Sequence, residues 1–82
     1  MKRIGVIAVI IEHDETNVAQ VNAILSDFAQ DIKGRMGIPK VEEGINVISL
    51  IVDSDSDTIG AVTGKLGKVK GVTVKSMLAP QK

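Results

Sequence analysis

Few residues in this chain could carry out chemistry. Its 82 residues include no cysteine and a single histidine, His13. The lack of cysteine excludes disulfides, thiolate metal ligands and a thiol nucleophile. One histidine without an obvious nucleophile cannot build a Ser–His–Asp arrangement, and as a weak metal candidate it would need ligands from a second copy. We therefore expect no catalytic residue, no cofactor and no enzymatic activity.

The acidic stretch "DSDSD", residues 53–57, resembles the first positions of an EF-hand calcium loop. Such a loop needs glycine at its sixth position and glutamate at its twelfth, where this chain has Thr58 and Gly64. Acidic residues at this spacing instead favour the start of a helix, where Ser54 or Asp55 can act as the N-cap. We predict a helix start here and no calcium site.

The stretch "GAVTGKL", residues 60–66, resembles a phosphate-binding loop. It is one residue short of the Walker spacing, and Leu66 occupies the Ser/Thr position that would hold magnesium. It also lies inside an expected helix rather than ahead of one. We expect its glycines to allow close packing of the helix on a sheet, or to loosen the last turn, and we predict no nucleotide site.

The stretch "GRMGIPK", residues 34–40, places a cation between two glycines. Gly34 and Gly37 permit a bulge, a turn or a close backbone approach, and Pro39 cannot continue a hydrogen-bonded ladder. Strand alternation puts Arg35 on the same side as Lys33. The opposite side then holds Ile32, Met36 and Ile38.

Arg35 has two interpretations. In the first, its charge and the nearby proline protect an exposed sheet edge from unwanted pairing. In the second, Arg35 faces a subunit boundary, and its guanidinium grips a small anionic ligand through two hydrogen bonds, with Gly34 and Gly37 beside it.

Charge is balanced overall but unevenly distributed. Lysine and arginine together number ten, as do aspartate and glutamate, so no net positive charge attracts nucleic acid. After Asp57 the only charged residues are lysines, which makes Lys65, Lys68 and Lys70 candidates for binding an acidic protein partner.

The sole aromatic, Phe28, lies on an expected helix, and there is no helix-turn-helix segment. We therefore expect no direct reading of nucleic acid by the isolated chain.

Two apolar runs rich in valine and isoleucine, "RIGVIAVIIEH" and "INVISLIVD", are typical of strands buried on both faces. The first is too short to span a bilayer and is followed by no signal cleavage site. We therefore expect a cytoplasmic protein without a membrane segment. A short extended segment before Pro39, a turn at "KVEEG" and a last strand at "VTVKSML" complete the strand signals.

Two segments show helical spacing of apolar residues. The first contains Val18, Val21, Leu25 and Phe28, and the second contains Ile59, Val62 and Leu66. Asp14 or Thr16 can cap the start of the first helix. Lysines in the last turn of the second helix suit its dipole, and Gly71 is expected to act as its C-cap.

The element order is therefore β-α-β-β-α-β, which predicts one domain spanning residues 1–82. We expect an α+β, ferredoxin-like fold with a four-stranded antiparallel sheet and two helices on one face. The first and third strands would be central. The uncovered side of the first strand would present one of two rows: Ile7, Val9 and Ile11, or Ile4, Val6, Ala8 and Ile10. An exposed apolar row of this kind predicts a homo-oligomer, a dimer or a tetramer, joined through sheet faces or edges.

Nearly the whole chain resembles one family. The matching stretches are "VIAVIIEHDE", "VNAILSDFAQDIKGRMGIP" and "INVISLIVDSDSDTIGAVTGKLGKVKGVTVKS", of which "GRMGIP" and "TGKLG..GV.VKS" are the most specific. They resemble the iron-only hydrogenase system regulators, small single-domain proteins with an ACT-like ferredoxin fold. The resemblance implies regulation of genes or proteins for hydrogenase assembly. This sequence departs from the nickel-sensing pattern of related repressors, because it lacks cysteine and all but one histidine.

Two hypotheses follow for the function. One is a regulatory module that binds a small effector or oligomerises. The other is a protein-interaction module, without a small-molecule ligand, that docks an acidic partner through the lysines near the end of the second helix.

Overall fold

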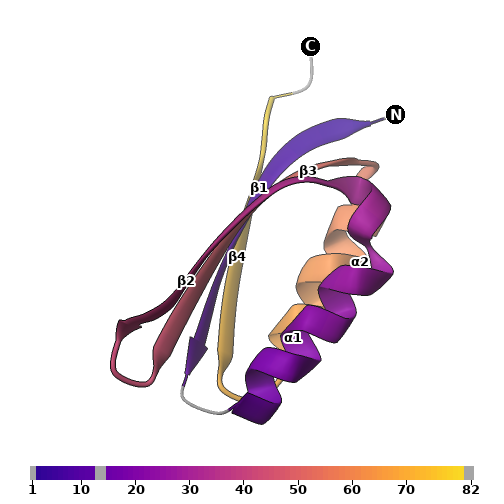
Figure 1. Cartoon of the computed structure of the whole chain (residues 1–82). Helices are drawn as coiled ribbons and strands as arrows, with labels where there is room; N and C mark the ends of the chain where they lie inside the picture. Colours follow the sequence, from indigo (N-terminus) through magenta and orange to yellow (C-terminus); the bar gives the residue numbers. More distant parts are fainter. Residues whose placement is uncertain (1, 13–14, 81–82) are drawn as a thin grey trace.

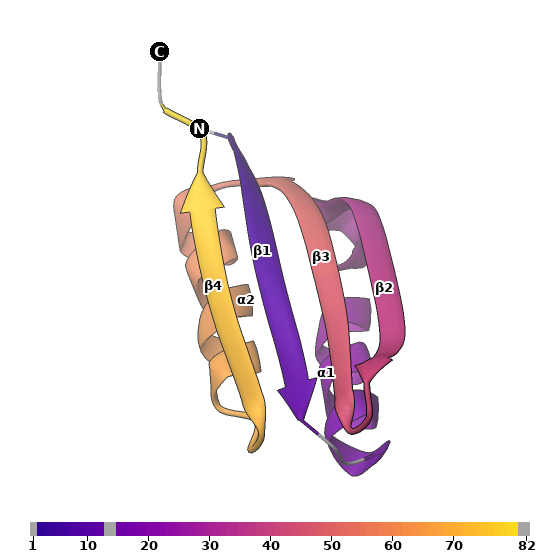
Figure 2. The ribbon, with the colours of Figure 1, turned by 90° about the vertical axis from the view of Figure 1, so that its left-hand side faces the viewer.

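The computed structural model describes residues 2–12 and 15–80 (Figure 1). Its elements are β1 (Arg3–Glu12), α1 (Glu15–Asp27), a short 3₁₀ helix η1 (Ala29–Asp31), β2 (Ile32–Glu42), β3 (Ile45–Ser54), α2 (Ser56–Gly67) and β4 (Val72–Leu78). The four strands form one antiparallel sheet in the order β2-β3-β1-β4. Figure 2 shows both helices behind this sheet. The predicted ferredoxin-like order is confirmed, with the first and third strands at the centre.

The hydrophobic core is a single layer between the sheet and the helices. In β1 the odd-numbered residues Ile7, Val9 and Ile11 are fully buried there. Consequently the alternative row of β1, from Ile4 to Ile10, lies on the side without helices. Burial of one such side chain contributes about 1.5–3 kcal/mol. The helices bury most of the residues that their spacing predicted: Val21 and Leu25 from α1, and Ile59, Val62 and Leu66 from α2. Val18 and Phe28, also predicted, are partly buried against this core, and Phe28 lies just beyond the end of α1.

The start of α2 is fixed by Asp55. Its Oδ1 accepts a hydrogen bond of 2.7 Å from the backbone N–H of Thr58, and this bond holds the pKa of the Asp55 carboxyl below its ordinary value. Asp55 is therefore the N-cap, while Ser54, the other residue considered, is buried at the end of β3. For α1, the expected cap Asp14 lies outside the described residues and Thr16 lies within the helix.

The prediction that Gly71 caps α2 is wrong. The helix ends at Gly67, with Lys68 as its C-cap in an ordinary helical conformation. Gly71 lies beyond the helix with a φ of +78°, where it turns the chain into β4. This left-handed backbone favours glycine because it has no Cβ.

Close packing does not explain the glycines inside α2. A Cβ added at Gly60 or Gly64 would meet nothing within 4 Å, so the prediction that these residues let the helix approach the sheet is wrong. The close approach occurs in β1 instead. A Cβ at Gly5 would lie 2.9 Å from Leu78 Cδ2 and 3.2 Å from the backbone oxygen of Met77.

Strand β2 is longer than its sequence predicted, because it continues through Pro39 to Glu42 and leaves only a tight turn before β3. Its pairing with β3 is interrupted twice. The first interruption, between Ile32 and Gly34, places both Ile32 and Arg35 on the helix side of the sheet, opposite buried residues of β3. The prediction that Ile32 shares a side with Met36 is therefore wrong, because a bulge shifts the alternation by one residue.

The second interruption lies between Ile38 and Glu42 and surrounds the proline. Here Lys40 adopts a φ of +51°, and its backbone N–H donates a hydrogen bond of 2.9 Å to Asn46 Oδ1 of β3. Because Pro39 has no N–H to give to a ladder, a bulge at this point is the expected accommodation.

Candidate functional site

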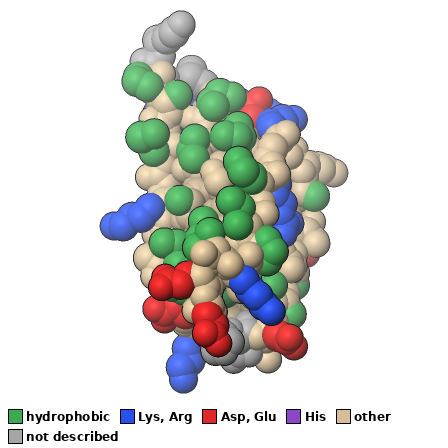
Figure 3. Space-filling view, turned by 60° about the vertical axis from the view of Figure 1, so that its left-hand side comes forward, with side chains coloured by type: hydrophobic (Ala, Val, Ile, Leu, Met, Phe, Trp, Pro, Cys, Tyr) green, Lys and Arg blue, Asp and Glu red, His purple; other side chains and the backbone are tan. Residues whose placement is uncertain are grey.

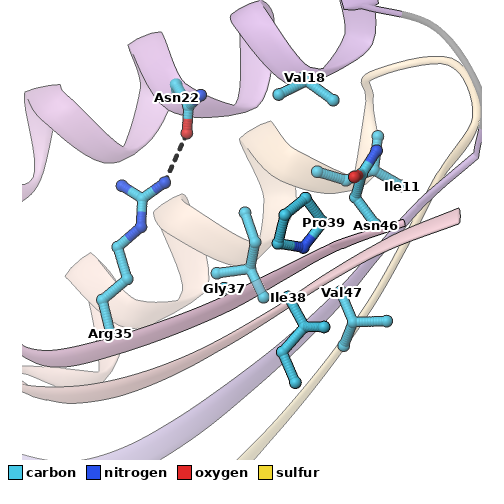
Figure 4. A pocket seen from close by; sticks show the side chains of 10 residues that line it. Ile11, Val18, Asn22, Arg35, Gly37, Ile38, Pro39, Asn46 and Val47 are labelled. Atoms are coloured by element: carbon cyan, nitrogen blue, oxygen red, sulfur yellow. Dashed lines mark hydrogen bonds between the residues drawn. The ribbon is translucent and has the colours of Figure 1, made fainter. Parts of the chain in front are cut away.

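A pocket of about 160 Å³ lies between α1 and the β2–β3 edge of the sheet, beside the second bulge (Figure 4). Its lining comes from four elements: Ile11 of β1, Val18 and Asn22 of α1, Arg35, Gly37, Ile38 and Pro39 of β2, and Asn46, Val47 and Ile48 of β3. The lining is mainly apolar, and its side-chain polar groups belong to Asn22, Arg35 and Asn46. Pockets of this composition hold small molecules and orient them with a few polar contacts.

Arg35 stands at the edge of this pocket. One of its terminal nitrogens, Nη2, donates a hydrogen bond of 2.5 Å to Asn22 Oδ1 on α1, as Figure 4 shows. Among residues 2–12 and 15–80 no carboxylate forms an ion pair with Arg35. A guanidinium has five N–H donors, so this arrangement fixes the group in place without neutralising its charge. An anion in the pocket would therefore meet a positioned cation.

Asn46 supplies a second polar side chain to the pocket lining. Its Oδ1 accepts the hydrogen bond from Lys40, which leaves its Nδ2 as a donor beside the pocket. The bulge at Pro39 and the orientation of Asn46 are thus parts of one local arrangement. Together with Arg35 and Asn22, Asn46 gives the pocket donor groups suited to a carboxylate or a similar oxyanion.

The three residues proposed as a ligand site do not all come together. Arg35 and Gly37 line the pocket, and a Cβ at Gly37 would come no closer than 3.9 Å to Ile48, so Gly37 is not required there by crowding. Gly34 does not line the pocket, because it pairs with Ile51 on the opposite side of the sheet. The role of Gly34 in ligand binding is therefore not supported by its position.

Two lining residues, Asn22 and Asn46, were missed in the sequence. Asn22 lies four residues after Val18, so helical spacing places both on one side of α1. Asn46 is a polar residue near the start of an apolar strand. Either signal could have marked these residues, but only the packing of α1 over the sheet edge shows that they meet Arg35.

The candidate partner-binding lysines lie away from the pocket lining. Lys65 is in the last turn of α2, and its Nζ lies 5.3 Å from the centre of the Phe28 ring, a cation–π arrangement. Lys68 and Lys70 are exposed in the turn that follows α2. These three residues therefore form a basic end of α2 that is separate from Arg35.

The metal candidate His13 lies outside the described residues. Within residues 2–12 and 15–80, no group of three or more His, Asp or Glu side chains could hold a metal ion. In the same part of the chain, none of the helices has the length and apolar character needed to cross a bilayer.

The second notable surface is the side of the sheet that faces away from the helices, called the open face below. Alternate residues of all four strands form it: Ile4, Val6, Ala8, Ile10, Glu12, Gly34, Met36, Ile38, Glu42, Ile45, Val47, Ser49, Ile51, Asp53, Thr73, Lys75 and Met77. Its large apolar side chains are between 43% and 70% exposed at Ile4, Ile10, Met36, Ile38, Ile51 and Met77. Figure 3 shows hydrophobic side chains gathered over this surface, with acidic and basic residues mainly around it.

Residues 3–76 match a family model described as "TM1266-like: Iron-only hydrogenase system regulator, putative". The chain belongs to this family. The resemblance noted in the sequence is thereby confirmed. No curated protein matches the sequence.

Solved structures agree with this membership in the TM1266-like family. The chain is similar to the protein TM1266 from Thermotoga maritima, with 40% sequence identity, a TM-score of 0.93, and coverage of 98% of this chain and 100% of that one. It is also similar to the ACT domain from GTP pyrophosphokinase of Chlorobium tepidum, with 24% identity, a TM-score of 0.80, and coverage of 94% and 100% respectively. At that identity the second similarity shows the fold alone, which is ACT-like.

Enzymes also contain this fold. A homoserine dehydrogenase from Thiobacillus denitrificans matches with 15% identity and a TM-score of 0.65, and the match covers 95% of this chain but 17% of that one. The fold therefore does not decide the function of this family member. Its pocket has no nucleophile and no acid–base group among the lining residues.

Proposed function

We propose that this TM1266-like protein is a non-enzymatic regulator of an iron-only hydrogenase system that binds a small anionic effector in the pocket beside α1. The observation that carries the proposal is the position of Arg35, held at the pocket edge by neutral Asn22 with its charge unpaired among the described residues. Membership in a regulator family supports the same function.

The size of the pocket favours a small effector. Pockets for drug-sized ligands have volumes of about 300–1,000 Å³, and this one has about 160 Å³. A carboxylate or an amino acid of a few carbons suits that volume better than a nucleotide does. Its carboxylate would lie near Arg35, and its apolar part would contact Val18 and Ile48.

The absence of reactive groups in the lining supports a binding role rather than catalysis. Arg35 stays protonated at any ordinary pH and so cannot exchange protons as a general acid or base. The remaining polar groups of the pocket are carboxamides, which donate and accept hydrogen bonds without titrating.

Thermal unfolding with a panel of small carboxylates and amino acids tests this function. A ligand that binds only the folded state at a hundredfold excess over Kd stabilises it by about 2.7 kcal/mol. In a domain of this size the midpoint should then rise by about 10 °C or more. Arg35→Ala and Arg35→Lys should both weaken binding of any hit by at least tenfold, because lysine retains the charge but lacks the planar fork.

Lys33→Ala is the matched control, since it removes a neighbouring exposed cation of β2 that does not line the pocket. Its ligand affinity should equal that of the wild type. Unchanged affinity in Arg35→Ala would instead assign this arginine to edge protection and refute the effector site.

The second candidate function is docking of an acidic protein partner at the basic end of α2. The exposure of Lys68 and Lys70 next to Lys65, in a region whose only charges are lysines, favours it. Capture of such a partner should weaken steeply with salt because exposed charges are screened. Reversal of Lys68 and Lys70 to glutamate should abolish the capture and leave ligand-induced stabilisation unchanged.

Self-association is part of the proposed function. The apolar open face supports a homo-oligomer, because the largest apolar patch on a soluble protein is often an interaction site. Sedimentation of the unliganded protein at micromolar concentration should therefore give at least a dimer.

A further inference from the structure

The apolar residues of the open face lie in adjoining rows across the sheet. In the row through Val6, strand pairing places Ile51 on one side and Met77 on the other. Two residues further along β1, Ala8 is paired with Ser49 and Lys75. The apolar surface is thus continuous across three strands in the row through Val6 and runs along β1 from Ile4 to Ile10, with polar side chains on both sides of Ala8.

The area of the open face follows from the strand pairing. Seven residues of β1, Gly5–Ile11, are paired on both sides. With strands about 4.8 Å apart and about 3.3 Å per residue, four strands of that length cover about 19 Å by 23 Å. That is in the range of the largest apolar patches on soluble monomers, which are often functional.

The charges on the open face indicate what covers it. Asp53 and Lys75 are the charged residues nearest its centre, while Glu12 and Glu42 flank Ile45 at the far end of the sheet. Asp53 is paired with Ile4 and Lys75 with Ala8, on strands that flank β1 on opposite sides. Because Val6 lies between Ile4 and Ala8 on the same face, it stands midway between the two charges.

This arrangement is self-complementary. Consider a two-fold axis above Val6 that runs parallel to the sheet and perpendicular to the line from Asp53 to Lys75. Rotation about this axis places Lys75 of each copy opposite Asp53 of the other. The same operation places the apolar centre of one open face on that of the second, as an isologous interface requires. A strongly charged partner would find one charge of each sign beside Val6 and no net attraction at this centre.

We propose that a second copy of this chain covers the open face around a two-fold axis at Val6, with two symmetric Lys75–Asp53 contacts across the interface. The proposal rests on the homo-oligomeric part of the proposed function and is independent of any effector. Edge pairing of β2 is disfavoured by its two bulges and by Pro39, which interrupt the row of free backbone groups.

Charge reversal tests how the two copies are oriented in the proposed dimer. Sedimentation equilibrium of the full, unliganded chain should give a dimer whose Kd rises at least tenfold in Lys75→Glu and in Asp53→Lys, because each single change creates two like-charge contacts. The double variant should return to within about threefold of the wild-type Kd. Lys70→Glu, an exposed lysine outside the open face, is the matched control and should leave Kd unchanged.

Ile51→Asp tests the face itself. This side chain is 43% exposed, so a carboxylate is tolerated in the monomer, whereas a dimer would bury it next to Val6. The variant should be monomeric with a wild-type circular dichroism spectrum. A wild-type monomer, a folded Ile51→Asp dimer of unchanged Kd, or single reversals without effect would each overturn the proposal.

The effector site is measured separately by titrating ligand hits into Ile51→Asp and into Arg35→Ala. Lost dimerisation with retained ligand binding in Ile51→Asp supports the interface and leaves the pocket intact. A normal dimer in Arg35→Ala that binds no ligand supports the pocket. The two proposals can therefore fail independently.

Discussion

Arg35 of the edge strand β2 and Asn22 of α1 are joined by a side-chain hydrogen bond across the mouth of the pocket. The bond links the sheet edge to the helix layer through a neutral partner. It therefore sets the position of the guanidinium while its charge stays available to a ligand.

Asn22→Asp should show whether ligand binding needs the free charge of Arg35 as well as its position. The new carboxylate keeps the contact with Arg35 but neutralises it, so the affinity for an anionic ligand should fall at least tenfold. The melting temperature should stay the same or rise slightly, since an ion pair at an exposed site contributes at most about 1 kcal/mol. Isothermal titration and thermal unfolding measure the two quantities.

Gln20→Glu is the control for this variant because it adds the same charge at an exposed position of α1 that does not line the pocket. Equal losses of affinity in both variants would show a general effect of helix charge and not a direct contact with Arg35.

Gly71→Ala should destabilise the protein. Its φ of +78° is unfavourable for alanine, and the added Cβ would lie 2.7 Å from Asn17 Nδ2. The left-handed conformation alone costs about 1–2 kcal/mol. Urea unfolding should show a loss of at least that amount, and a stability within 0.5 kcal/mol of the wild type, roughly the scatter of neutral surface changes, would contradict the turn geometry.

Gly60→Ala and Gly64→Ala should stabilise the protein, each by about 0.5–1 kcal/mol. Both glycines lie inside α2, where an added Cβ meets nothing within 4 Å. The same urea experiment applies, and the two changes should be close to additive if neither alters the packing of the helix. A loss of stability in either variant would show that the glycine has a role beyond helix propensity.

Asp55 should make stability depend on acid pH. Hydrogen bonding from Thr58 lowers the pKa of its carboxyl in the folded state below the ordinary 3.8. The stabilisation is therefore complete at pH values well above 3.8 and is lost as the pH falls through the folded pKa. Asp55→Asn retains an N-cap acceptor and should flatten this acid dependence, whereas Asp55→Ala should lower the melting temperature at neutral pH.

Melting curves of the three proteins between pH 2 and pH 7, a range that brackets ordinary carboxyl titration, measure this contribution. An Asp55→Asn protein with the same acid profile as the wild type would attribute the profile to other carboxyl groups.

Much of the fold could be predicted from local patterns. Apolar runs marked β1 and β3, and helical spacing marked the buried residues of α1 and α2, because burial repeats with the period of each element. The errors have non-local or geometric causes. The alternation of β2 failed at Ile32 because a bulge depends on how the neighbouring strand pairs, and Gly71 was misplaced because glycine signals a left-handed residue without saying which turn needs it.

The candidate site was less predictable than the fold. Arg35 stood out through its glycine and proline neighbours, but Asn22 and Asn46 join it only through the packing of α1 over the sheet edge. Gly34 was assigned to the same site although ordinary strand alternation places it on the side of the sheet opposite to Arg35. Sequence distance along one strand is thus a poor guide to which residues share a pocket.

Ile38 and Val47 belong to both surfaces of the molecule. They contribute to the pocket lining, while their side chains point to the other side of the strands, onto the open face (Figure 4). Under the two proposals, a ligand that shifts these strands changes the dimer dissociation constant. By linkage, dimerisation then changes the affinity for the ligand by the same factor. The effector concentration at half-saturation would then depend on how many copies of the protein a cell contains. Expression level would set the sensitivity of the response as directly as any residue in the pocket.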